Sequence, residues 1–268
     1  MKDIKTFAVE TALEAGALLK KRFSESHEVR YKSEIDLVTE TDGMAEELIV
    51  NRIERTFPSH DILAEERREI STGSAFRWII DPLDGTTNYS HGFPVFCVSI
   101  ALEREGRIIL GAIFNPMLEE LFTAERDGGA FLNGNRLRIS PTDSLNRSLL
   151  ATGFPYDIRE NRDNNLSYFN ALAVRAQAIR RAGSAALDLA YVAAGRFDGF
   201  WELRLKPWDT AAGTLLVEEA GGTISETGGA LFHLLSPSLL ATNGRIHPAM
   251  EEVFRATDPF DPGIRSAR

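Results

Sequence analysis

The sequence predicts an α/β protein in which helices and strands mix along the whole chain. Apolar residues recur at helical spacing at the start of the chain and again in its second half. Short apolar runs typical of strands fill the region between residues 61 and 114. The two kinds of segment do not alternate regularly, so a simple doubly wound sheet is not favoured.

The chain begins with two expected helices. Residues 3–23 carry apolar side chains at helical spacing, and three cations lie in the last turn, where they suit the helix dipole. A second helix is expected from about residues 41–42 to Phe57, and Pro58 ends it because proline interrupts the helical hydrogen bonding.

The expected strands and later helices follow in order. Strand-like runs cover residues 61–64, 77–80, 96–102 and 108–114, and the last two are joined by a hairpin at residues 103–107. The second half is expected to contain a helix near 160–176, a helix at 184–194, a strand at 198–203, and a helix from Trp208 that closes at Gly221-Gly222.

Composition sets the class of protein. A chain of 268 residues with 43% hydrophobic content can bury roughly three quarters of its unfolded surface. No linker or repeat divides it, so residues 1–257 are expected to form a single domain and residues 258–268 a loose C-terminal tail. The net charge of −9 argues against a broad nucleic-acid-binding surface.

Cysteine use and hydropathy indicate a cytoplasmic protein. Cys97 is the only cysteine, so an intrachain disulfide is impossible, and its apolar neighbours indicate a buried strand residue rather than a nucleophile. The N-terminus lacks an apolar secretion core, and no apolar run approaches the ~18 residues of a membrane-spanning helix.

The motif at residues 78–88 is the first candidate for chemistry. An apolar strand is expected to end at Asp81, and Pro82 and Gly85 then bend the chain, so that Asp84 can converge with Asp81 on one cation. The carbonyl of Leu83 can add another oxygen ligand of the kind that Mg²⁺ accepts. The alternative is an ordinary surface turn, but a strand precedes this motif and a pair of hydroxyl residues follows it.

Other acidic residues could complete a cluster. Glu65 and Glu66 follow a strand, and Asp42 ends the segment 36–42. Asp209 opens a helix, where capping alone is the favoured interpretation, although a carboxylate has two oxygens and can both cap and bind a metal. Clustered carboxylates repel one another, and two Mg²⁺ ions would relieve that repulsion, activate water and stabilise a departing oxygen.

Three competing motifs fail. An EF-hand that began at Asp81 would need ligand residues where Leu83 and Gly85 stand. A haloacid-dehalogenase-type phosphatase would need its aspartyl nucleophile at Pro82. The chain also lacks the glycine-rich phosphate loop that ends in Lys-Ser/Thr, which argues against an NTPase.

These residues together resemble the inositol monophosphatase family over nearly the whole chain. The matching segments are Ala64-Glu65-Glu66, residues 81–88 (DPLDGTTN) and residues 208–213 (WDTAAG), supported by residues 36–39, 151–155 and 181–186. The resemblance implies a layered α/β/α/β/α sandwich of the inositol monophosphatase / fructose-1,6-bisphosphatase type, usually a homodimer. It also implies two or three Mg²⁺ ions per site and inhibition by Li⁺.

The resemblance further implies a role for each site residue. The metal ligands would be Glu65, Asp81, Asp84, Asp209 and the carbonyl of Leu83. Glu65 and Thr86 would orient the attacking water, Asp42 would hold the Thr86 hydroxyl, and a water near Asp84 would protonate the leaving alkoxide. The substrate contacts would be the amides of Gly85 and Thr86 for the phosphate, Gly183, Ser184, Ala185 and Glu202 for the alcohol, and Lys32 on a loop near the metals.

The expected activity is therefore Mg²⁺-dependent hydrolysis of an inositol monophosphate, such as myo-inositol 1-phosphate. A fructose-1,6-bisphosphatase or another small-metabolite phosphatase is the alternative within the class, with Arg180, Arg181 and Arg204 as possible cations for a second phosphate. A Mg²⁺-binding interaction module on the same fold is the alternative outside it. No nucleic-acid or membrane partner is expected.

Overall fold

The computed structural model describes residues 3–23, 29–31, 37–67 and 69–257. The expected tail at 258–268 and Lys32 lie outside the described residues, and the assignment of residues 1–257 to one domain stays a prediction. The helices are α1 (Ile4–Arg22), α2 (Glu40–Thr56), α3 (Thr86–Ser90), α4 (Leu166–Ala173), α5 (Ala185–Ala193), α6 (Pro207–Glu219) and α7 (His247–Ala256).

Within the described residues, the strands form three sheets. A seven-stranded sheet has the order β3 (Asp61–Ala64), β4 (Phe76–Asp84), β5 (Cys97–Arg104), β6 (Arg107–Asn115), β7 (Glu120–Glu125), β8 (Gly129–Leu132) and β9 (Asn135–Arg136). A five-stranded sheet has the order β11 (Ala178–Arg180), β10 (Leu149–Thr152), β12 (Gly199–Leu203), β14 (Ser238–Thr242) and β13 (Thr223–Ser225). A small sheet pairs β1 (Val29–Tyr31) with β2 (Leu37–Thr39).

The seven-stranded sheet is buried on both faces, which explains its nearly continuous apolar strands. In β4, Trp78 and Ile80 belong to the core beneath α1 and α2, whereas Ile79 belongs to the core around α5 and α6. This alternation follows from the two-residue period of a strand. The sheet therefore needs helices on both sides.

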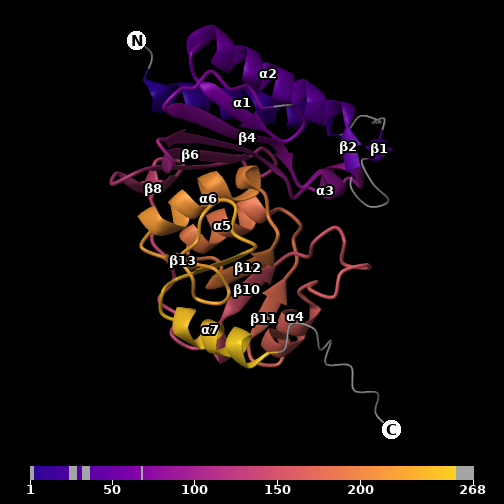
Figure 1. Cartoon of the computed structure of the whole chain (residues 1–268), viewed down its shortest axis with the longest axis vertical. Helices are drawn as coiled ribbons and strands as arrows, with labels where there is room; N and C mark the ends of the chain where they lie inside the picture. The colour runs from indigo at the N-terminus through magenta and orange to yellow at the C-terminus, as the bar shows by residue number, and fades with distance from the viewer. Residues whose placement is uncertain (1–2, 24–28, 32–36, 68, 258–268) are drawn as a thin grey trace.

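The layers stack as α/β/α/β/α, which confirms the predicted sandwich (Figure 1). Helices α1 and α2 cover the outer face of the seven-stranded sheet. Helices α5 and α6 lie between the two large sheets, and α4 and α7 pack on the far face of the five-stranded sheet. The middle helical layer thus has a sheet on either side.

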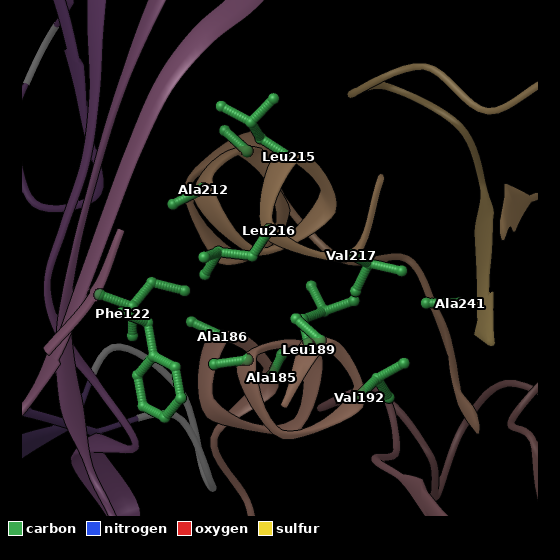
Figure 2. Close-up of a cluster of buried hydrophobic side chains, with 14 of the residues drawn as sticks. Phe122, Ala185, Ala186, Leu189, Val192, Ala212, Leu215, Leu216, Val217 and Ala241 are labelled. Atoms are coloured by element: carbon green, nitrogen blue, oxygen red, sulfur yellow. The ribbon is translucent and has the colours of Figure 1, made fainter. Parts of the chain in front are cut away.

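Tight packing fixes the middle layer. Figure 2 shows Leu189 of α5 facing α6, with Phe122 on the side of the seven-stranded sheet and Ala241 on the side of the five-stranded sheet. Gly213 of α6 allows this approach, because a Cβ there would lie 2.6 Å from the Leu189 side chain. Helices packed so closely hold their N-termini at fixed positions, and these N-termini help to form the site described below.

Several boundaries differ from the sequence predictions. Strand β4 does not end at Asp81, because pairing with β5 resumes at Asp84 after an irregularity. The helix expected over 160–176 is confined to α4, since hydrogen-bonded turns form residues 157–161 instead. Among the described helices, none has the length and hydropathy that crossing a membrane requires.

Candidate active site

A cavity of about 690 Å³ opens beside the middle helical layer. Its walls come from the ends of β3 and β4, the N-termini of α5 and α6, and strand β12. The predicted metal and substrate residues that the structure describes all line this cavity: Glu65, Asp81, Leu83, Asp84, Gly85, Thr86, Gly183, Ser184, Ala185, Glu202 and Asp209. Asp42, predicted to hold the Thr86 hydroxyl, is not among the lining residues. Residues far apart in the chain are therefore brought together as expected.

A β-bulge in β4 presents the two central carboxylates. Asp81 is paired with Ser99 and Asp84 with Cys97, so β4 holds one extra residue over this interval. Such a bulge re-aims side chains, and here both carboxylates reach the same cavity. The Asp81 side chain accepts a hydrogen bond from the Leu83 amide at 3.0 Å, which fixes the bulged backbone.

Asp84 joins the seven-stranded sheet to the middle layer. Its Oδ2 atom accepts hydrogen bonds from the Ser184 hydroxyl at 2.6 Å and from the Ala186 amide at 2.8 Å. The Cys97 thiol lies 3.7 Å from the same oxygen. Burial raises the pKa of Asp84, and the bonds from the first turn of α5 oppose that rise. Cys97 is a buried strand residue, as predicted.

Thr86 is held between two oxygens. Its hydroxyl lies 3.0 Å from the Asp42 carboxylate and 3.0 Å from the Leu83 carbonyl. The hydroxyl has one proton, so it donates to one of these acceptors at a time. Gly85, immediately before it, has a φ of 98°, and a Cβ there would lie 2.8 Å from the Val95 carbonyl oxygen. A glycine is therefore required at this turn.

The remaining acidic residues come from two further elements. Asp209 is in the first turn of α6, where one carboxylate oxygen accepts a 2.6 Å hydrogen bond from the Lys206 amide. Capping engages one oxygen only, so it is compatible with a second ligand. Glu65 follows β3, and the next amide, that of Glu66, donates to the buried Glu46 at 2.8 Å. The backbone that carries Glu65 is thereby fixed.

The acidic groups of the site raise one another's pKa. Burial raises the pKa of Asp81 well above its ordinary value, and Glu65, Asp84 and Asp209 raise it further. Burial likewise raises the pKa of Asp209, with Asp84 as the largest charged contributor. A cation would relieve this repulsion between like charges, and an all-oxygen donor set suits a hard cation such as Mg²⁺.

The carboxyl groups are not arranged around one common metal position. Within the described part of the chain, no three carboxylate, imidazole or thiol side chains stand at metal-ligand spacing. Holding an ion therefore requires these side chains to turn toward it. The donor chemistry nevertheless fits Mg²⁺, because carboxylate and carbonyl oxygens are the ligands that a hard cation prefers.

The cavity wall also contains Glu202. The Glu202 carboxyl lies directly against Gly153, where any Cβ would collide with it. Burial raises the pKa of Glu202 to about 8, although Arg181 nearby lowers it and Asp84 raises it further. At neutral pH this carboxyl is therefore largely protonated and can both donate and accept hydrogen bonds.

The structure adds roles that sequence reasoning missed. Ser184 stays a predicted alcohol contact, and its hydroxyl also donates a hydrogen bond to Asp84. Asp188 also lines the cavity and carries no predicted role. Its signal was a single acid inside the otherwise uncharged helix α5. Gly153 belongs to a segment that matches the family, and its role becomes visible only beside Glu202.

The metal-free protein is expected to lose stability as the pH rises. The folded state holds a proton on Glu202 up to about pH 8, whereas the unfolded state releases it near the ordinary value of 4.5. Between these values the unfolded state binds fewer protons, so the free energy of unfolding falls as the pH increases. Thermal unfolding in chelator should show a lower Tm at pH 8 than at pH 5.5.

Glu202→Gln tests the cause of this trend. The substitution removes the titrating group but keeps the size of the side chain, so the decline of Tm with pH should become shallower. The other raised carboxyls, Asp81 and Asp209, act in the same direction and preserve part of the slope. An unchanged slope would show that Glu202 does not hold its proton in the folded protein.

Comparisons with known proteins agree with this geometry. The family model described as "Inositol monophosphatase family" matches residues 1–257. An inositol-1-monophosphatase of Rhizobium meliloti is 44% identical over 94% of this chain and 96% of its own. The Nus factor SuhB of Escherichia coli is 44% identical over 93% of this chain and 95% of its own.

A solved structure shares the whole fold. The extragenic suppressor protein suhB of Bartonella henselae superposes with a TM-score of 0.89 at 42% identity and covers 93% of this chain and 97% of its own. Family model, relatives and structure all span nearly the full chain, cavity included. The chain belongs to the inositol monophosphatase family.

Proposed function

We propose that this protein is a Mg²⁺-dependent phosphatase that hydrolyses an inositol monophosphate, such as myo-inositol 1-phosphate, to inositol and phosphate. The observation that carries the proposal is one cavity lined by two kinds of carboxyl group. Asp81, Asp84 and Asp209 repel one another, whereas Glu202 is largely protonated near neutral pH. The first group suits cations and a phosphate, and Glu202 suits a hydroxyl group of an alcohol.

Five groups would hold the ions: Glu65, Asp81, Asp84, Asp209 and the carbonyl of Leu83. When bound, two or three Mg²⁺ ions would supply Lewis-acid activation of water and stabilise charge on the leaving oxygen. No side chain needs to act as a nucleophile, and the buried thiol of Cys97 has its pKa raised by burial, which makes it a poor one.

The chain's own residues would orient the reactants. Thr86 and Glu65 would direct the attacking water, because the Thr86 hydroxyl is held by Asp42 and its lone pairs can accept a hydrogen bond. The amides of Gly85 and Thr86 would bind the phosphate. Holding water and phosphorus in line lowers the barrier by removing the entropic cost of bringing them together.

A second phosphate has less support than a free alcohol. Arg204 is engaged by Asp157 at 2.6 Å, and the Arg180 guanidinium donates to the Ile179 carbonyl. Arg181 lines the cavity, but it interacts electrostatically with the acids Asp188 and Glu202, whose pKa values it lowers. Its positive charge is therefore partly balanced within the protein. A monophosphate of a polyol therefore fits better than fructose 1,6-bisphosphate.

The proposal extends to properties that family membership supports. We include inhibition by Li⁺, a cytoplasmic location and a homodimer. The name of the Escherichia coli relative, a Nus factor, favours an interaction role as a second candidate function. With a net charge of −9, a protein is a more suitable partner for this chain than a nucleic acid.

A substrate panel tests the proposal. Release of phosphate should be measured from myo-inositol 1-phosphate, fructose 1,6-bisphosphate, glycerol phosphate and p-nitrophenyl phosphate, each with Mg²⁺, with chelator, and with Mg²⁺ plus Li⁺. The highest kcat/KM is expected for myo-inositol 1-phosphate, with activity lost in chelator and reduced by Li⁺. Activity that survives chelation, or a clear preference for the bisphosphate, would overturn it.

A further inference from the structure

Asp188 has no role in the chemistry described so far. It lies in α5, where every other residue from Ala185 to Ala193 is uncharged, and its exposed fraction is 1%. Asp188 lines the cavity. Its Oδ1 atom is buried and has no hydrogen-bond partner among the described residues.

A buried acid without a partner is unfavourable, because its water hydrogen bonds have been lost without replacement. Asp188 is in the first turn of α5, where the helix dipole favours a negatively charged side chain. The dipole does not explain why one of its oxygens has no hydrogen-bond partner. Rotation about the Cβ–Cγ bond is soft for aspartate, so either oxygen can turn toward an occupant of the cavity. The carboxyl is therefore arranged to meet a group that the protein itself does not supply.

The neighbours of Asp188 indicate the chemistry of that group. Burial raises its pKa well above the ordinary value, Glu202 and Asp84 raise it further, and Arg181 lowers it. One guanidinium thus faces two carboxyls, so at least one of them keeps its proton near neutral pH. A protonated carboxyl beside an ionised one offers a donor and an acceptor together, which matches a hydroxyl group better than a phosphate or an apolar ring.

We propose that Asp188 is a specificity-determining residue that hydrogen-bonds a hydroxyl group of the leaving alcohol beside Glu202. This inference rests on the proposed function, because it takes the substrate to be the phosphate of a polyhydroxylated alcohol. A site built to pair with a hydroxyl discriminates strongly against alcohols that lack it, since its own polar groups are then left unpaired. Asp188 would therefore favour polyol phosphates over aryl phosphates.

The test compares Asp188→Leu and Asp188→Asn with the wild type on two substrates. Myo-inositol 1-phosphate offers hydroxyls, and p-nitrophenyl phosphate offers none. For Asp188→Leu, kcat/KM on the inositol substrate is expected to fall about 10- to 100-fold, mostly through KM, with a loss at most about a third as large on the aryl substrate. Asp188→Asn keeps one acceptor oxygen, so its kcat/KM on the inositol substrate should lie between those of the wild type and Asp188→Leu.

Two further measurements separate this role from a structural one. Free myo-inositol should inhibit Asp188→Leu much more weakly than the wild type, because product binding uses the same hydroxyl contact. The Tm of Asp188→Leu should equal or exceed that of the wild type, since an unpartnered buried acid is replaced by an apolar side chain in an apolar helix. Asp143→Asn, an exposed acid paired with Arg147, is the matched surface control.

Each contrary outcome has a definite meaning. Equal losses on both substrates would show that Asp188 acts on the reacting phosphate rather than on a hydroxyl of the alcohol, and the absence of a loss on either substrate would show that it contacts neither. A shift in the Mg²⁺ concentration for half-maximal activity would instead indicate a cation site. If the wild type prefers another polyol phosphate, the proposed function fails, and the Asp188 comparison is made with that substrate. If it prefers no polyol phosphate, both fail.

Discussion

Asp84→Asn is expected to lower kcat by roughly three orders of magnitude while the protein stays folded. The amide removes one negative charge from the group that would hold the cations. It also places a potential donor against the Ala186 amide, which now donates to Asp84 at 2.8 Å. The measurement is phosphate release at saturating Mg²⁺ and substrate, with circular dichroism to confirm folding.

A graded control accompanies this variant. Ser184→Ala removes the 2.6 Å hydrogen bond to the same carboxylate but keeps its charge, so a much smaller loss is expected. If Asp84→Asn retained more than a tenth of the wild-type kcat, Asp84 would not belong to the ion-binding set. If both variants lost activity equally, the position of Asp84 rather than its charge would be decisive.

Trp201→Ala is expected to lower the free energy of unfolding by about 3–5 kcal/mol, the range for truncating a large buried side chain. Trp201 is fully buried in β12 and packs near Phe254 of α7, with ring centroids 6.2 Å apart. Its indole nitrogen donates to the Asn165 side chain at 2.6 Å. Urea unfolding followed by circular dichroism measures the loss.

Two companion variants divide this effect into its parts. Trp201→Phe keeps an aromatic ring but leaves the Asn165 oxygen without its donor, so a loss of about 1–3 kcal/mol is expected. Leu231→Ala changes a side chain that is 87% exposed, and its effect should stay within about 0.5 kcal/mol. A loss below about 1 kcal/mol for Trp201→Ala would contradict the packing described for this layer.

Local sequence patterns predict those parts of the fold that depend on near neighbours. The hairpin between β5 and β6 is one case, because its two turn residues, Glu105 and Gly106, both have positive φ and glycine adopts such a φ readily. The amphipathic helix α1 is another, since its seven buried residues are spaced as one face of a helix. Neither prediction needs the rest of the chain.

Long-range pairing explains what the sequence leaves open. Strand β10 has only four residues, and it becomes a central strand because β11 and β12 pair with both of its edges. The bulge in β4 likewise depends on the register of β5, which no local pattern encodes. Motif recognition located the acidic residues of the site, but it could not reveal that Ser184 binds Asp84 or that Asp188 lies unpartnered in the wall.

The bond between Asp84 and Ser184 ties the reaction centre to the order of folding. It joins residues separated by 100 positions in the chain, and such distant contacts form late because closing a long loop costs entropy. A nascent or partly folded chain can complete the hairpin of β5 and β6 long before its cavity exists. The protein can therefore become active only after the middle helices have packed against the seven-stranded sheet. Activity regained during refolding thus measures complete tertiary folding rather than local structure.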